Sequence, residues 1–231
     1  MNNRSVASTP SSTPTDRLGT IALARQAVFS GAPTTADVAL QPWLERSWRR
    51  CLAWGHQPQQ RVVFDPVSAG DMRRAQDASQ PLLQAAAPVV RSLARAMADT
   101  RYFAILTDAD GVVIGVNGPV DHHDPQATGI ARVGVDLSER AVGTTAIGTT
   151  LAEKQAVWLH RGEHFFDDTG VYSCAGAPVM GPDGRCVGML DLTGIWVPER
   201  PALKHLVSQS AQAIENAMTV ATPHALLLRV N

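Results

Sequence analysis

Two turn sequences, each placed between short apolar runs, constrain the fold of this chain more than any other feature. They are DADG at residues 108–111 and GPDG at residues 181–184. A glycine-containing turn that joins two apolar runs is typical of a β-hairpin, so a sheet built around two antiparallel hairpins is predicted. The flanking runs cover residues 102–107, 112–116, 171–180 and 185–193, and a further run covers 156–160.

Helical patterns surround these hairpins. Apolar residues recur at intervals of three and four over 83–97 and over 201–219, as in amphipathic helices. Ser138 has the side chain to cap the helix-permissive stretch that follows it. Two earlier helices are expected at 39–54 and directly after Asp65, where Pro66 suits the first helical position. The chain is therefore expected to form an α+β fold, an antiparallel sheet with helices on one face.

The last predicted strand alternates between two kinds of side chain. Asp191 and Thr193 share one face, and Leu190 and Leu192 share the other. The leucine face suits packing against helices, whereas an acid and a hydroxyl in mid-strand indicate a polar-lined cavity. The alternative is a solvent-exposed face at the edge of the sheet. We favour the cavity, because the residues that precede Asp191 on its own face are apolar.

The overall composition excludes several classes of function. The 231 residues carry a formal net charge of -1, which provides no general attraction to nucleic acid or to an anionic membrane. No apolar run reaches membrane-spanning length. The three cysteines, Cys51, Cys174 and Cys186, form no CxxC pair, so neither a disulfide framework nor a zinc knuckle is indicated. We expect a cytoplasmic protein that binds neither nucleic acid nor membrane directly.

Five motifs occur together, in the order typical of one protein family. They are FAILTDADG at 103–111, VGTTAIG at 142–148, GEHF at 162–165, CAGAP at 174–178 and LDLTG at 190–194. In this combination the chain resembles the N-terminal GAF sensor domains of the acetoin dehydrogenase operon activators, which are sigma-54-dependent, Fis-family transcription regulators. The SWRRC helix at 47–51 resembles the segment that precedes the sensor in that family.

Four regions are expected along the chain. Residues 1–37 are predicted to be a disordered leader, since they begin with a run rich in Ser, Thr, Asn and Pro. A helical N-terminal extension at 38–78, the GAF sensor at 79–221 and a tail or linker at 222–231 follow. Complete activators of this class continue into an AAA+ ATPase and a helix-turn-helix, for which these residues show no counterpart. We therefore expect either part of a longer regulator or a free-standing sensor.

A ligand cavity is the functional site that the resemblance implies. We expect a binding module rather than an enzyme, a homodimer, and no metal, cofactor or catalytic residue. By resemblance the ligand is acetoin or another small carbonyl compound or alcohol, and its binding alters the packing of the flanking helices. The side chains predicted to line the cavity are Phe103, Thr144, Thr145, Trp158, His164, Cys174, Asp191 and Thr193.

Two other functions stay open at this point. Cys174 with His164 as its base would make a thiol redox enzyme of the methionine sulfoxide reductase kind. A cavity filled by its own side chains would leave a ligand-free dimerisation module. The HRGEH sequence at 160–164 has the HxxEH spacing of a zinc protease, but it follows a strand and contains a glycine, so we favour a loop beside the pocket. DHHD at 121–124 is expected to be a solvated loop.

Two further stretches have alternative explanations. GTTAIG at 143–148 offers hydroxyls and backbone amides to a polar ligand, or small residues for close helix-on-sheet packing, and the sequence does not separate the two. Arg46, Arg49, Arg50 and Arg61 concentrate positive charge on or near one helix. A solvated helix face, or a contact with a second protomer, is favoured there over nucleic-acid binding.

Overall fold

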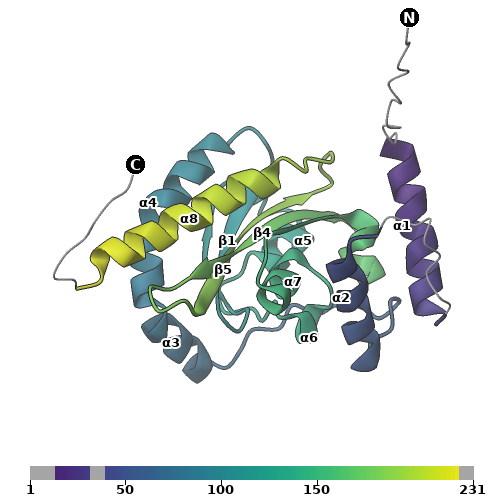
Figure 1. Cartoon of the computed structure of the whole chain (residues 1–231), viewed down its shortest axis with the longest axis horizontal. Helices are drawn as coiled ribbons and strands as arrows, with labels where there is room; N and C mark the ends of the chain where they lie inside the picture. Colours follow the sequence, from purple (N-terminus) through teal and green to yellow (C-terminus); the bar gives the residue numbers. More distant parts are fainter. Residues whose placement is uncertain (1–13, 32–39, 224–231) are drawn as a thin grey trace, which may run out of the picture.

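The computed structural model describes residues 14–31 and 40–223, and its centre is a five-stranded antiparallel sheet (Figure 1). The strand order is β2-β1-β5-β4-β3, so both predicted hairpins join neighbouring strands and β5 is central. The predicted α+β fold with an antiparallel sheet is confirmed. The strands are β1 (Tyr102–Asp108), β2 (Val113–Asn117), β3 (Val157–His160), β4 (Tyr172–Met180) and β5 (Cys186–Ile195).

Two long helices lie side by side on one face of the sheet (Figure 1). They are α4 (Gln80–Ala96) and α8 (Leu203–Ala221), and both predicted amphipathic stripes belong to them. Leu190 and Leu192 of β5 are buried in the same apolar cluster as the stripes of the two helices. This face of the sheet is therefore packed as a dry core.

The opposite face of the sheet is covered by the crossover between β2 and β3. The crossover contains three short helices, α5 (Pro125–Ile130), α6 (Glu139–Val142) and α7 (Ala146–Glu153). Ser138 caps α6, as predicted, and Thr145 caps α7. The long helices are gathered on one face as expected, and the short ones are added on the other because the central strands are buried on both sides.

The predicted leader over residues 1–37 is in part helical. Helix α1 (Pro14–Phe29) packs beside the domain, while 1–13 and 32–37 lie outside the described residues. Ile21, Ala24 and Val28 share one side of α1 and are buried in the core below the sheet's cavity face. A disordered leader is therefore wrong for this helix. Composition misled here, because the polar residues are concentrated ahead of the apolar stripe.

The helical extension contains α2 (Pro42–Ala53) and α3 (Ala69–Ala78). Pro66 is not the first residue of α3 as predicted, because it forms a β-bridge with Val135 and the helix is capped by Ser68. The domain boundaries expected from the sequence stay predictions. None of the helices in the described part of the chain combines the length and hydrophobicity that a bilayer crossing requires.

Candidate ligand-binding site

Strand register brings three of the predicted site residues together. Cys174 of β4 is the register partner of Thr193 of β5, and Asp191 lies two residues earlier on the same side of β5. All three side chains are buried. The alternative that this face is exposed at a sheet edge is wrong, because β5 pairs with β1 on one side and with β4 on the other.

These three side chains meet Thr145 and His164 in a buried cavity between the sheet and the crossover. The Thr145 hydroxyl accepts the Gly148 amide at 3.1 Å, which fixes it at the start of α7. The cavity volume is about 10 Å³, which is room for about one water molecule. The rest of the lining is mostly apolar and consists of Phe64, Ile130, Leu137, Ala146, Ile147, Thr169 and Tyr172.

Asp191 has one carboxyl oxygen satisfied and one free. The Thr193 hydroxyl donates to Asp191 Oδ2, whereas Oδ1 is buried and has no hydrogen-bond partner among the described residues. Burial raises the pKa of Asp191 to about 7, against the opposing effect of the Thr193 hydrogen bond. Near neutral pH this carboxyl can therefore hold a proton and donate it in a hydrogen bond from Oδ1.

His164 presents the complementary group. Burial lowers its pKa to about 4, so its imidazole is neutral at physiological pH. Its Nδ1 lies 2.9 Å from the carbonyl oxygen of Arg161, and the proton is therefore on Nδ1. Nε2 is then an acceptor, and it is buried with no partner within the described part of the chain. An unpartnered buried polar group costs about 1–3 kcal/mol, so this pair indicates a place for a polar guest.

Cys174 is held in its thiol form. Its Sγ lies 3.5 Å from Thr193 Oγ1, and burial raises the pKa of the thiol well above its ordinary value. A buried thiol of high pKa is a poor nucleophile. Cys51, on α2, contacts Thr144 at 3.6 Å, and Cys186 begins β5, far along the strand from Thr193. The arrangement therefore fits a binding surface better than a thiolate site.

Three of the predicted lining residues, Thr144, Trp158 and Phe103, are not in the lining of this cavity. The Thr144 hydroxyl lies 2.7 Å from Ser47 Oγ on α2, because Thr144 and the capping Thr145 point to different sides at the start of α7. Trp158 lies on the face of α4 and α8, where it stacks on His160 at 5.8 Å. Its register partner is Ala175, whereas the neighbouring pair of Leu159 with Cys174 faces the cavity, so strand parity excludes Trp158.

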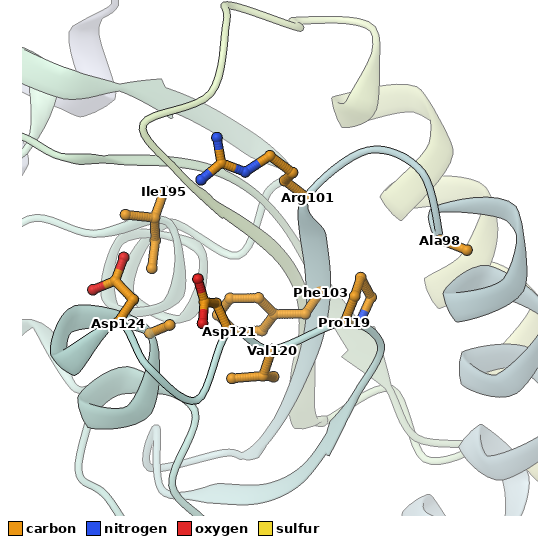
Figure 2. A pocket seen from close by; sticks show the side chains of 9 residues that line it. Ala98, Arg101, Phe103, Pro119, Val120, Asp121, Asp124 and Ile195 are labelled. Carbon is orange, nitrogen blue, oxygen red and sulfur yellow. The ribbon is translucent and has the colours of Figure 1, made fainter.

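Phe103 lies beside the cavity at a second, open pocket of about 290 Å³. It is the register partner of Thr193, so the two residues are neighbours on the same face of the sheet. Figure 2 shows the carboxylates of Asp121 and Asp124 and the guanidinium of Arg101 around it. Part of the loop predicted to be solvated therefore forms the wall of a pocket.

The HRGEH sequence does not assemble a metal centre. His160 Nδ1 contacts Ser173 Oγ, and the Glu163 carboxylate accepts the His160 amide at 2.7 Å and pairs with Arg17. His164 instead lines the cavity. Among the described residues, no group of three or more His, Cys, Asp or Glu side chains could hold a metal ion.

Packing explains the glycines of GTTAIG. A Cβ on Gly148 would lie 2.5 Å from the Glu139 backbone nitrogen, and one on Gly143 would lie 2.7 Å from the Phe166 ring. Small residues are therefore required at both positions, and Thr145 alone of this stretch's hydroxyls reaches the cavity.

The arginines of α2 contact acids of the same chain. Arg46 and Arg50 pair with Glu153, Arg50 also pairs with Glu139, and Arg49 pairs with a glutamate of its own helix. These ion pairs attach α2 to the crossover helices, so that part of the helix face is occupied within the chain.

Sequence reasoning missed the apolar part of the lining. Tyr172 could have been found, because it lies two residues before Cys174 and therefore on the same face of β4. Its hydroxyl donates to the carbonyl oxygen of Gln126 at 3.0 Å, which attaches the sheet to α5. Phe64 and Ile130 come from irregular or short segments, and no sequence periodicity marks them.

Known proteins of similar sequence give independent evidence for the family to which this chain belongs. The family model described as the N-terminal domain of MimR matches residues 13–216. The propane 2-monooxygenase operon transcriptional activator MimR of Mycolicibacterium goodii is 30% identical over 191 residues, which is 81% of this chain and 31% of that protein. The acetoin catabolism regulatory protein of Cupriavidus necator is 29% identical over 180 residues, 75% of this chain and 27% of that protein. The chain spans less than a third of the length of these curated relatives.

Among solved structures, the E. coli DhaR(N)–DhaL complex contains a chain with the same fold. The TM-score is 0.71 at 18% sequence identity, over 78% of this chain and 61% of that chain. At this identity the likeness concerns the fold alone. With the sheet order described above, it confirms the GAF-type fold predicted from the sequence.

Proposed function

The chain belongs to the MimR N-terminal domain family, and from this premise we propose that it is the small-molecule-sensing GAF regulatory domain of a bacterial transcription regulator. The relatives that cover most of the chain are operon regulators, in accordance with the resemblance found in the sequence. The cavity between sheet and crossover is the proposed sensing site. Its output passes to the helices outside the sheet, with the chain in a homodimer in the cytoplasm.

One observation carries the proposal: His164 and Asp191 line the same cavity, and each has a buried polar atom without a partner among the described residues, His164 Nε2 and Asp191 Oδ1. A ligand hydroxyl would donate to His164, and a ligand carbonyl oxygen would accept the proton of Asp191. A small neutral molecule that carries both groups satisfies both atoms, and acetoin is the simplest such probe. An anionic ligand is disfavoured, because the neutral His164 offers it no positive charge and an ionised Asp191 would repel it.

The closed cavity is also the reason that binding would transmit a signal. Its volume of about 10 Å³ holds no more than a water molecule, so apolar lining side chains such as Phe64 and Ile130 must shift to admit a ligand. A ligand that binds only the shifted arrangement changes the population of that arrangement. A cavity this small is also what a ligand-free dimerisation module has, so a ligand that expands the cavity is what distinguishes the sensor from that alternative.

The test is a thermal-shift and calorimetric titration of the whole chain with acetoin. We expect a saturable rise in melting temperature as acetoin is added. Asp191→Ala should bind acetoin with about tenfold lower affinity, which corresponds to the loss of roughly one hydrogen bond. Asp183→Ala, in the exposed β4–β5 turn, is the matched control and should bind as the wild type does.

Binding by the wild type should weaken as the pH rises through about 7, where Asp191 loses its proton. Asp191→Asn keeps a donor and should remove that pH dependence.

An unchanged melting temperature with acetoin and with other small ketones and alcohols would contradict the proposed ligand class. The thiol redox alternative has its own test, turnover of free methionine sulfoxide that disappears in Cys174→Ser. The protonated, buried thiol favours binding over this chemistry.

A further inference from the structure

The segment that carries His164 is held by side chains from outside the sheet. Four consecutive carbonyl oxygens, those of residues 162–165, each accept a hydrogen bond from a side chain of α1 or α2. The donors come from only two residues, an arginine and a tryptophan. Arg25 donates to Gly162 at 3.1 Å, to His164, and to Phe165 at 2.7 Å, and Trp48 Nε1 donates to Glu163 at 2.9 Å.

Further contacts keep helix α1 on this segment. The Arg25 side chain is only 14% exposed, and it also pairs with Asp167 at 2.6 Å. Phe29, at the end of α1, packs on Phe165 at 5.1 Å and on Trp48 at 5.6 Å between ring centres. A largely buried guanidinium that donates to three carbonyls and a carboxylate is held firmly in this position. Any other side-chain conformation would leave its N–H groups unpaired.

His164 lies within the run of capped carbonyls. It follows β3 and the short helical turn of Arg161–Glu163, so no neighbouring strand fixes its position. Its ring is oriented by its Nδ1 bond to Arg161, inside the same segment, and the residue lines the cavity. The place of Nε2 therefore depends on where the segment backbone is held.

We propose that Arg25 and Trp48 are positioning residues that hold His164 at the cavity, and that docking of helix α1 and occupancy of the cavity are thereby coupled. The second half of this inference rests on the proposed sensing function. Coupling of this kind is reciprocal: if docked α1 strengthens ligand binding, a bound ligand holds α1 more firmly by the same factor. Helix α1 would then be the element that reports the state of the cavity.

The first experiment needs no ligand. Arg25→Ala and Trp48→Phe remove the donors, and Arg74→Ala, an exposed arginine of α3 paired only with its helix neighbour Asp71, is the matched control. Hydrogen exchange of the amides at 162–167 should be at least about tenfold faster in both test variants and unchanged in the control. Asp167→Asn, which keeps the carbonyl contacts, should stay close to the wild type.

The second readout is the titration of His164, followed by NMR of labelled histidine. A looser segment admits water, so the pKa of His164 should rise from about 4 toward 6.5 in Trp48→Phe, which removes a donor but no charge. In Arg25→Ala the loss of the nearby guanidinium charge raises this pKa as well, whereas a general loss of stability would not move it in molecules of either variant that remain folded. Wild-type exchange at 162–167 together with a wild-type titration of His164, in folded Arg25→Ala and Trp48→Phe, would overturn the inference.

Acetoin then separates this inference from the proposed function. If the wild type binds acetoin, Arg25→Ala should bind it about 5- to 150-fold more weakly, the usual range of coupling between sites, and Arg74→Ala should bind normally. Equal binding by Arg25→Ala would refute the coupling while the sensing function stands. If the wild type binds no small ketone or alcohol, the proposed ligand class fails, and the exchange and titration measurements still decide the positioning role.

Discussion

The two faces of the central sheet use the same strand for opposite purposes. On the side of α4 and α8, Leu190 and Leu192 of β5 pack into an apolar cluster. On the other side, Asp191 and Thr193 of the same strand place a carboxyl and a hydroxyl at a cavity. Successive residues of one strand therefore have different effects on the free energy of unfolding. Those on the face of α4 and α8 stabilise the fold, and those on the cavity face lower its stability because they bury unpartnered polar groups.

The difference between the faces follows from what covers them. Two long amphipathic helices offer continuous apolar surface, so the dry face is mostly apolar, with Trp158 Nε1 as a buried polar atom that has no partner among the described residues. The cavity face is covered by short helices and loops, whose caps and ends bring a hydroxyl and an imidazole to the cavity. A guest that satisfies the unpaired atoms recovers free energy that the empty fold has lost.

The largest expected effect lies on the dry face. Leu192→Ala removes a fully buried side chain and should lower the free energy of unfolding by about 2–5 kcal/mol, measured by urea denaturation. Molecules that remain folded should bind acetoin with wild-type affinity, because Leu192 does not face the cavity. A loss of affinity in the folded variant would break the division between the faces.

The second prediction concerns pH and the two titrating groups of the cavity face. Between about pH 4 and 7 the folded chain keeps the Asp191 proton that the unfolded chain loses, so this group lowers stability as the pH rises. Between about pH 4 and 6.5 the unfolded chain gains a proton on His164 that the folded chain refuses, so this group raises stability as the pH rises. In the wild type the two effects oppose each other.

Single substitutions should separate the pH effects of Asp191 and His164 on stability. From pH 4.5 to 6, His164→Gln should lose stability relative to the wild type by on the order of 1 kcal/mol per pH unit, and Asp191→Asn should gain at a similar rate. Urea denaturation across this pH range measures both slopes. Parallel slopes in the wild type and both variants would show that these groups titrate as exposed ones do.

The smallest effect is expected for Trp158→Phe. Trp158 Nε1 is buried and without a partner among the described residues, so its removal relieves a penalty that partly offsets the lost contact area. The stability change should stay within about 1 kcal/mol, and acetoin affinity should not change, because the ring lies on the dry face. A marked loss of acetoin affinity would show that Trp158 contributes to the binding site, and that the two faces of the sheet are not separate at β3.

The sequence predicts what depends on local pattern. The two hairpins, the stripes of α4 and α8, and the common face of Asp191 and Thr193 all follow from periodicity and turn residues, and the structure has all of them. Cys174, in the strand predicted over residues 171–180, lies on the same face. The cavity-facing positions of β4 and β5 were therefore accessible without a structure.

The features that could not be predicted depend on which face of a short element each residue occupies and on contacts between residues far apart in the sequence. The prediction of Trp158 at the cavity fails because a four-residue strand offers no alternation that tells its two faces apart. Thr144 and Thr145 are adjacent and chemically alike, and only the start of α7 between them decides which one reaches the cavity. Helix α1 was missed because its stabilising contacts are with a segment more than a hundred residues away.

The capped carbonyls of residues 162–165 also determine where this fold can be divided. Their donors, Arg25 and Trp48, both lie ahead of the predicted start of the sensor at residue 79. A fragment that began there would keep all five strands yet leave four adjacent acceptors of its own backbone without their donors. Hydrogen bonding therefore attaches α1 and α2 to the sheet, although neither helix contributes a strand to it.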